Sequence, residues 1–358
     1  MLSNDLKRVA DEVRGLQSKR AGAVAALKEA AVGGLGAFDV LEKGLRLNTL
    51  AIVPQGRIVA VDGGIVAQEF HGIDLFLVRA CAVAFDYENG SVKGYDYHPS
   101  RLPPYAIHAR HSLQSHEFAW FNGLLRLDCE LACAIGAAEK FSPKVLLLDG
   151  SIMPQVSDRP AKESPAYSTY EEVLEKFKRL YQLSQERGFW LAGVIKDSRG
   201  RHFLDLVSNA AGGLLKDYAQ VLERTNDTVF LYDFLAEGER TPAFKYSSAA
   251  GEHLVLRDLG DWSRKIASFY VKPAPFDRPL RVDFLLNGAA ADIPPLADLI
   301  CALSKGNKSY AYPAVLIEAD MQAAMPQDEA RFFSDALFAT LGRGPDLMEL
   351  RRNSRPFR

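Results

Sequence analysis

The sequence has few cysteines, no long apolar run and almost no excess charge. Its four cysteines are unevenly spaced and include no Cys-x-x-Cys pair, which excludes a disulfide framework and a zinc finger, so we expect buried thiols. No apolar stretch approaches the ~18 residues that span a bilayer, and the first residues lack a signal-peptide core, so we expect a cytoplasmic protein without membrane contact. With a formal net charge of -2, nucleic acid would have to be bound through a local basic surface or metal ions.

Several catalytic signatures are also missing. There is no P-loop, no Gly-x-Ser-x-Gly elbow and no Gly-x-Gly-x-x-Gly after a strand, which argues against an ATPase, a serine hydrolase and a dinucleotide enzyme. His108, His111 and His116 resemble metal ligands, but they lack a Glu-x-x-His context. We therefore expect them to lie in a loop as surface or capping residues.

A length of 358 residues suggests about two domains or one enlarged domain. Residues 1–50 carry apolar side chains at helical spacing and predict an N-terminal helical segment. Residues 51–342 form the expected main domain, with an accessory insertion at about 198–264, where glycines break the periodicity. Residues 343–358 are rich in arginine and predict a basic tail.

The main domain alternates strand and helix patterns. An antiparallel meander is expected first, from strands at about 57–66, 75–85 and 91–95. A long helix, a short apolar strand, a second helix and another strand follow, at about 112–141, 144–148, 169–185 and 189–196. Two further strands and three helices close the fold, at about 266–272, 280–285, 291–304, 314–324 and 328–341. The fold class is a mixed α/β sheet flanked by helices.

Acids end or interrupt two apolar strands. Asp62 precedes Gly63-Gly64 inside a β-branched run, and Asp149 ends the run from Val145. A lone carboxylate there is costly unless it binds a cation or accepts hydrogen bonds, although an Asp-Gly turn is the simpler alternative at each position. Two such motifs in one chain favour a metal site.

Glu130 lies in the long helix on a face of small residues that would allow close approach to the sheet. The alternative is a surface ion pair with Arg126, one helical turn earlier, and spacing does not decide between them. Clustered carboxylates suit Mg²⁺ or Mn²⁺, and such ions assist attack of water on a phosphodiester. The acids therefore point to nuclease chemistry.

Taken in order, the motifs between about Ile58 and Met325 resemble the NurA-type DNA-repair nucleases, which have an RNase H-like fold and work beside the hexameric translocase HerA. The segments that carry the resemblance are Ala60 to Gly64, Arg126 to Glu130, Leu148 to Ser151, Val194 to Ser198, Phe269 to Lys272, Arg281 to Asp283 and Tyr312 to Asp320.

The resemblance implies that Asp62, Glu130 and Asp149 bind Mn²⁺ or Mg²⁺, that Lys196 contacts the phosphate and that Tyr312 is part of the site. Its last motif departs from the family, which usually ends in Ala-His where this chain has Ala319 and Asp320. An Asp can bind Mg²⁺ or Mn²⁺ but cannot act as a neutral imidazole.

We expect Asp320 to act as a fourth metal ligand on a C-terminal helix, about two turns after Tyr312. Glu318 is the rival if the helix register differs.

The function expected is therefore a divalent-metal-dependent nuclease that cuts DNA ends or single strands as a homodimer docked on a HerA-like hexameric ATPase. The alternative is a catalytically impaired scaffold that guides DNA or assembles the translocase complex. RNA as substrate stays open, because recognition of a 2′-hydroxyl leaves no signature in this sequence.

Overall fold

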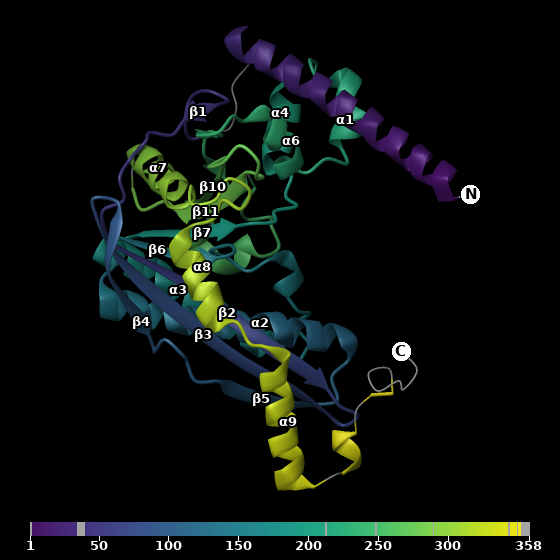
Figure 1. Cartoon of the computed structure of the whole chain (residues 1–358), viewed down its shortest axis with the longest axis vertical. Helices are drawn as coiled ribbons and strands as arrows, with labels where there is room; N and C mark the ends of the chain where they lie inside the picture. The colour runs from purple at the N-terminus through teal and green to yellow at the C-terminus, as the bar shows by residue number, and fades with distance from the viewer. Residues whose placement is uncertain are drawn as a thin grey trace. The chain divides into compact units, whose positions relative to one another are not determined.

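The computed structural model describes residues 2–33, 40–211, 213–247, 249–288, 290–342, 344–348 and 350–351 (Figure 1). The chain divides by packing into two compact units, which we describe separately. The first unit comprises residues 1–53, 194–249 and 264–313, and the second comprises 54–193, 250–263 and 314–358. The sequence-based division at residues 50 and 342 concerns folding domains and stays a prediction.

The sheet of the second unit begins with a meander of β2 (Gly56–Glu69), β3 (Ile73–Glu88) and β4 (Ser91–His98). Strand β6 (Val145–Asp149) runs parallel to β2 on the other side, and β7 (Trp190–Ile195), which begins in this unit, lies beside β6. The resulting order, β7-β6-β2-β3-β4, is that of an RNase H-like sheet. This confirms the fold class expected from the sequence.

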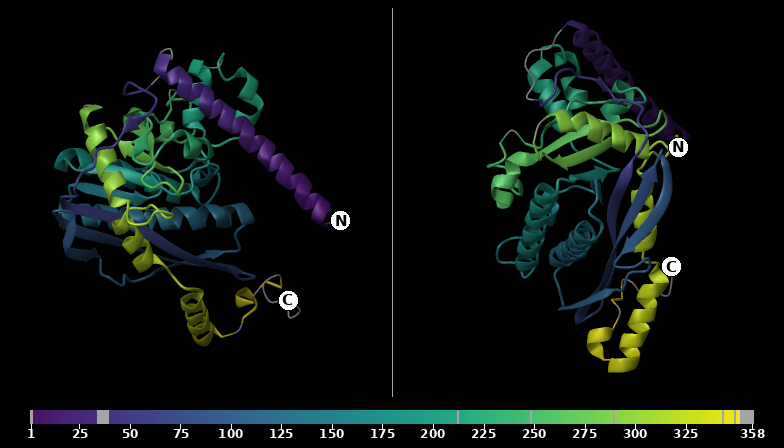
Figure 2. Two further views of the ribbon diagram at one scale, coloured as in Figure 1. Left: turned by 45° about the horizontal axis from the view of Figure 1, so that its top comes forward. Right: turned by 90° about the vertical axis from the view of Figure 1, so that its left-hand side faces the viewer.

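Helices cover both faces of this sheet (Figure 2). On one face lie α2 (Ser115–Phe141) and α3 (Tyr167–Arg187), whose apolar sides are buried. Helix α2 ends at Ser142, which adopts the left-handed conformation before Pro143. On the other face, α8 (Ala314–Ala323) packs across β2 and β3. The short helix η1 (Val156–Asp158) contacts α2.

The long ends of β2 and β3 are covered by the C-terminal part of the chain. Helix α9 (Gln327–Leu341) packs Phe333, Leu337 and Phe338 against Phe70 and Leu75. The short helix η5 (Pro345–Leu347) follows, and the backbone of Gly72 donates a hydrogen bond to Asp346 there. Of the predicted basic tail, residues 343, 349 and 352–358 lie outside the described residues.

The first unit contains an antiparallel set of strands, ordered β1 (Leu47–Asn48), β8 (Glu239–Arg240), β10 (Ile266–Val271) and β11 (Leu280–Leu285), with β9 (Phe244–Lys245) also on β10. Its helices are α1 (Leu2–Gly33), α4 (His202–Ala211), η2 (Lys216–Tyr218), α5 (Ala219–Leu222), α6 (Asp227–Phe234), η4 (Ala290–Asp292) and α7 (Ile293–Leu303). Helix η3 (Leu256–Lys265) belongs largely to the second unit. The described part of the predicted insertion is thus mainly helical.

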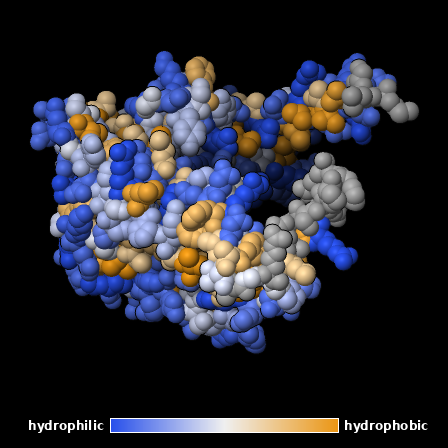
Figure 3. Space-filling view, turned by 60° about the horizontal axis from the view of Figure 1, so that its bottom comes forward, coloured by the Kyte–Doolittle hydropathy of each residue, from blue (hydrophilic) through white to orange (hydrophobic). Residues whose placement is uncertain are grey.

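Helix α1 is a single helix with two different halves. Its second half buries Ala23, Val24 and Leu27 in an aromatic core with α4 and α6. Its first half leaves Leu6 and Val13 exposed, so orange apolar side chains stand beside blue ones along it (Figure 3). Within the described ranges, no helix is both long and apolar enough to cross a membrane.

In the second unit, one expectation is wrong and one of the alternatives is excluded. Residues 106–111, expected as a loop, form strand β5 (Ala106–His111) against β3, because β3 is long enough to pair with a second strand beyond the end of β4. Asp62 lies in an unbroken strand rather than a turn, since β2 and β3 pair continuously through Gly63 and Gly64.

Candidate metal centre

Two aspartates lie side by side because of the register between two parallel strands. Val61 of β2 is aligned with Leu148 of β6, so the next residues of the two strands are Asp62 and Asp149. Strand β6 ends at Asp149, whereas β2 continues. The residues before each acid are apolar and buried. The pairing of the two strands therefore places the two carboxyl groups at one level of the sheet.

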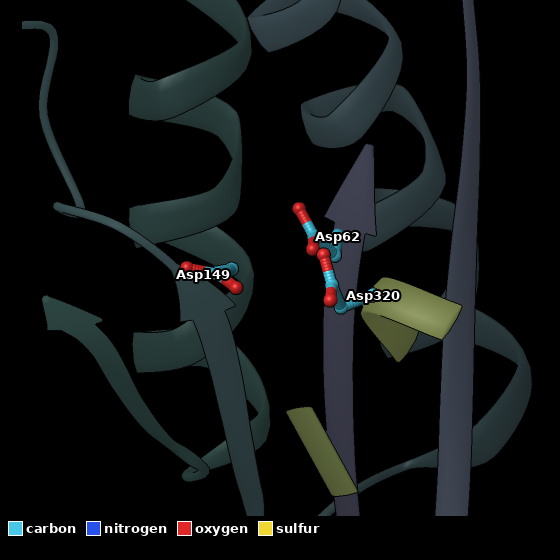
Figure 4. A group of neighbouring side chains, drawn as sticks. All are labelled: Asp62, Asp149 and Asp320. Carbon is cyan, nitrogen blue, oxygen red and sulfur yellow. The ribbon is translucent and has the colours of Figure 1, made fainter. Parts of the chain in front are cut away.

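A third aspartate comes from α8 on the face of the sheet opposite α2. Asp62, Asp149 and Asp320 each offer a carboxylate oxygen, and these atoms lie within 4.8 Å of one another (Figure 4). Asp62 is buried, Asp149 is partly buried and Asp320 is exposed. Helix α8 approaches β2 closely, because a Cβ on Gly64 would overlap the carbonyl oxygen of Ala323.

Glu130 reaches toward the same region from α2. A Cβ on Gly63 would collide with the Glu130 side chain, so the glycine makes room for this carboxyl group beside the strand. Its Oε1 accepts a hydrogen bond from Nη1 of Arg126 at 2.5 Å. The pair considered as an alternative therefore exists, but the Glu130 side chain is 8% exposed, so it is no ordinary surface pair.

The electrostatics of this region reflect burial and the mutual repulsion of neighbouring acids. Burial, with the charges of Asp149 and Glu130, raises the pKa of Asp62 to about 9, while the Gly63 N–H opposes the shift. Burial also raises the pKa of Glu130 to about 7, against the lowering effect of Arg126. The Arg126 guanidinium has a raised pKa, chiefly because of Glu130. Asp62 and Asp149 raise the pKa of Arg126 further, so the charges of several acids act on this guanidinium.

These donors fit a hard divalent cation. Carboxylate oxygens are the ligands that Mg²⁺ and Mn²⁺ favour. The raised pKa of Asp62 follows first from its burial and then from the charges of Asp149 and Glu130 beside it. Among the described residues, none of His108, His111 and His116 belongs to such a group. The donor chemistry is thus oxygen-only, and zinc-type coordination by histidine and cysteine is not offered.

Lys196 and Tyr312 lie together in the first unit. The Nζ of Lys196 is 4.6 Å from the centroid of the Tyr312 ring, and the Tyr312 hydroxyl donates a hydrogen bond to the Val194 carbonyl at 2.9 Å. Tyr312 is buried. The two residues therefore form a cation–π pair next to the end of β7.

Glu318, the rival to Asp320, is occupied elsewhere. It accepts a hydrogen bond from the hydroxyl of Tyr97 and another from Gln322, each at 2.9 Å. The helix register thus selects Asp320 for the acidic group. Arg126, expected only as a possible surface partner of Glu130, is in fact a cation beside the buried acids, and its i, i+4 spacing to Glu130 is the sequence signal for this role.

Comparison with known proteins identifies a family. The family model of the NurA domain matches residues 56–325, which is most of the chain. No curated protein matches the sequence.

Among solved structures, the chain is similar to the NurA nuclease from Sulfolobus solfataricus, with a TM-score of 0.58, 16% identity and 95% coverage of both chains. It is also similar to a NurA structure with manganese, with a TM-score of 0.53 and 12% identity over 96% of this chain and 99% of the other. At these identities the likeness concerns the fold.

Proposed function

The chain belongs to the NurA domain family of metal-dependent deoxyribonucleases, and on that premise we propose that it hydrolyses phosphodiester bonds at DNA ends or in single strands. One observation carries the proposal. Three aspartates from β2, β6 and α8 place their oxygens within 4.8 Å of one another. Carboxylates repel one another at this separation, and a bound Mn²⁺ or Mg²⁺ ion would offset the repulsion.

In this proposal Asp62, Asp149 and Asp320 hold the divalent ion, and Glu130 lies beside them as a fourth acid. A bound ion supplies Lewis-acid polarisation of the phosphate and lowers the pKa of a water molecule. Asp62 must release its proton to act as a ligand, since its pKa in the metal-free protein is about 9. Arg126 holds Glu130 in place through their ion pair and reduces the net negative charge of the four acids.

We assign Lys196 the role of a cationic contact to the DNA phosphate. The ring of Tyr312 lies 4.6 Å from its ammonium group and would restrict the rotamers of the lysine. The hydrogen bond from Tyr312 to the Val194 carbonyl in turn fixes the ring. Tyr312 is therefore a positioning residue in this proposal rather than a group that touches DNA.

Partner proteins complete the proposed role. The sequence contains no P-loop, so movement along DNA would come from a HerA-like hexameric ATPase on which a homodimer of this chain docks in the cytoplasm. The exposed apolar side chains of the first half of α1, and the basic tail, are the segments we propose for such contacts. Removal of residues 343–358 should weaken co-purification with the ATPase and leave Mn²⁺ binding unchanged; unchanged co-purification would assign the tail no docking role.

The decisive experiment is a nuclease assay on end-labelled linear duplex and single-stranded DNA with Mn²⁺, Mg²⁺ or EDTA. We expect cleavage with the metal ions and none with EDTA. Asp62→Asn should lower the cleavage rate by at least 100-fold, because it removes the charge of a ligand and preserves its volume. Labelled RNA of the same sequence tests the alternative substrate.

Asp74→Asn is the matched control, since Asp74 is a buried aspartate of the neighbouring strand β3 and accepts a hydrogen bond from Leu113. It should leave the rate within a few-fold of the wild type. Unaltered cleavage by Asp62→Asn would refute the metal-nuclease proposal. DNA binding without cleavage under any metal condition would instead establish the scaffold alternative.

A further inference from the structure

A second candidate site lies in the first unit. A pocket of about 900 Å³ opens between α1, the segment after β7 and α6. Its volume is within the range of small-molecule sites and exceeds what a lone phosphate ion needs. Eleven of its thirteen lining residues are polar or charged, as the complete set shows: Gln17, Ser18, Arg20, Ala21, Asp197, Ser198, Arg199, Asn226, Thr228, Val229, Tyr232, Asp233 and Arg278.

The charges of this pocket leave it positive. Arg278 forms an ion pair with Asp197, so these two side chains balance each other. Arg20 and Arg199 form no ion pair with any other residue in the part of the chain that the structure describes. Two guanidinium groups are thus available to a ligand, and guanidinium groups bind phosphate oxygens in bidentate geometry.

The remaining acid of the pocket is Asp233, and the ammonium groups of two lysines lie near this residue. The Asp233 carbonyl accepts a hydrogen bond from Nζ of Lys28 at 2.8 Å. Burial lowers the pKa of Lys272, and the charge of Asp233 opposes that shift, which places the lysine within electrostatic range of this carboxylate. Asp233 therefore does not cancel the positive charge of Arg20 and Arg199.

Tyr232 adds an aromatic ring to the lining of the pocket. It is 40% exposed, and Nζ of Lys272 lies 4.3 Å from its ring centroid. Asn226 and Thr228 supply side-chain groups that can donate and accept hydrogen bonds. An aromatic ring, two available guanidinium groups and amide and hydroxyl groups are together the usual contacts of a nucleobase and its phosphate.

We propose that this pocket binds a phosphorylated nucleotide, held by Arg20 and Arg199 at the phosphate and by Tyr232 at the base. The ligand chemistry is that of a nucleoside monophosphate, either free or as the 5′-terminal residue of a DNA strand. The lining of this pocket and the acidic group of the proposed nuclease centre have no residue in common.

Isothermal titration calorimetry in EDTA tests the site with four probes: dAMP, deoxyadenosine, inorganic phosphate and 5′-phosphorylated hexadeoxyadenylate. We expect dAMP to bind at least 10-fold more tightly than deoxyadenosine, because only dAMP engages the arginines. Arg20→Gln and Arg199→Gln should each weaken dAMP binding at least 10-fold. Tyr232→Ala should weaken dAMP binding and leave phosphate binding unchanged.

Arg224→Gln is the matched control, since Arg224 is an exposed arginine of the same unit outside the pocket, and it should leave every affinity unchanged. Arg199→Lys keeps the charge and should retain part of the affinity, which separates ligand binding from a folding defect. Binding of the hexanucleotide with the same arginine dependence assigns the site to a strand end, and binding of dAMP alone assigns it to a free nucleotide. If the affinity for dAMP is the same in the wild type, Arg20→Gln and Arg199→Gln, the proposal is overturned.

The same titrations distinguish this proposal from that of the nuclease. Asp62→Asn removes a proposed metal ligand and should leave dAMP binding in EDTA unchanged, because Asp62 lines no part of the pocket. Loss of nucleotide binding only in the arginine variants would support the pocket even if no DNA cleavage were found.

Discussion

Asp320 shows how one side chain changes the chemistry available to a site. The family motif that the sequence resembles ends in histidine, whereas this chain supplies a carboxylate whose oxygen joins those of Asp62 and Asp149. A carboxylate is a hard, charged donor, and an imidazole is a neutral donor that titrates near pH 6.5. In the proposed centre, aspartate in place of histidine would therefore keep a metal-binding group at this position and change how that group responds to pH.

Asp320→His should introduce a dependence of cleavage on pH between about 5.5 and 7.5, with the rate rising as the imidazole loses its proton. It should also increase the preference for Mn²⁺ over Mg²⁺, because imidazole suits transition metals better. Rates measured over this pH range with each ion test both effects, with Asp320→Asn as the uncharged control. A variant that matches the wild type in pH profile and metal preference would place Asp320 outside the catalytic centre.

Asp62 makes the stability of the metal-free protein depend on pH. Its folded pKa of about 9 exceeds the ordinary value of 3.8, so the folded state holds the proton more tightly than the unfolded state between these values. The contribution of this group to the free energy of unfolding is therefore greatest at low pH and falls as pH rises from about 4 to about 9.

In EDTA, the melting temperature of the wild type should thus decline more steeply between pH 5 and pH 9 than that of Asp62→Asn, which has no proton to lose. Thermal melts followed by circular dichroism measure the difference. Adding Mn²⁺ should reduce the decline at high pH, where the carboxylates are free to bind it. Parallel curves for the two proteins would contradict the assignment of a raised pKa to Asp62.

At the scale of the element, strand β2 carries Asp62 followed by two glycines, and each glycine leaves room for a neighbouring element on a different face of the sheet. Successive residues of a strand point to alternate sides, so Gly63 faces Glu130 of α2 and Gly64 faces the end of α8. The missing side chains let both helices approach the strand that carries Asp62. This local sequence thereby determines how close the donors from three elements can come.

Gly64→Ala should push the end of α8 away from β2, since the new Cβ overlaps the Ala323 carbonyl oxygen. Overpacking of this kind costs about 1–3 kcal/mol of unfolding free energy, and the displaced Asp320 should lower Mn²⁺ affinity and cleavage. Gly15→Ala is the control, because nothing lies within 4 Å of that position on α1 and it should stabilise the helix by about 1 kcal/mol. Urea unfolding and Mn²⁺ titration of both variants measure these effects.

Much of this element pattern could be predicted from periodicity alone. The apolar runs around residues 58 and 145 correctly predict buried strands, and the 3.6-residue spacing after Ser112 predicts α2. Strand β5 was missed because its burial alternates only weakly and its pairing depends on the length of β3. Edge strands of this kind are stabilised by backbone hydrogen bonds to a neighbour, which leave little trace in their own sequence.

The acidic group was foreseeable only in part. Strand-end acids indicated Asp62 and Asp149, whereas Asp320 was expected from the family motif and from helical spacing. The Asp-Gly-Gly sequence also left a turn open as the alternative, because the close approach of two helices that requires the glycines is a tertiary property. The pocket around Arg199 could not be predicted, since it combines residues from four separated segments.

For the whole molecule, metal binding should appear as added stability. A ligand that binds only the folded state stabilises it by about 2.7 kcal/mol at a concentration 100 times its Kd. Differential scanning calorimetry should therefore show a melting temperature that rises with Mn²⁺ in the wild type. The double variant Asp62→Asn with Asp149→Asn should show no rise, and an equal rise in both proteins would locate the binding elsewhere.

The positions of the three aspartates in the chain also determine when during synthesis the proposed metal centre can be complete. A ribosome-bound chain that has been translated through β6 already contains Asp62 and Asp149, but α8 and its Asp320 emerge much later. Cleavage chemistry that requires all three carboxylates is thus withheld until nearly the whole fold has formed. Truncated products that end before α8 would carry Asp62 and Asp149 without Asp320, so the proposed centre would be incomplete in them.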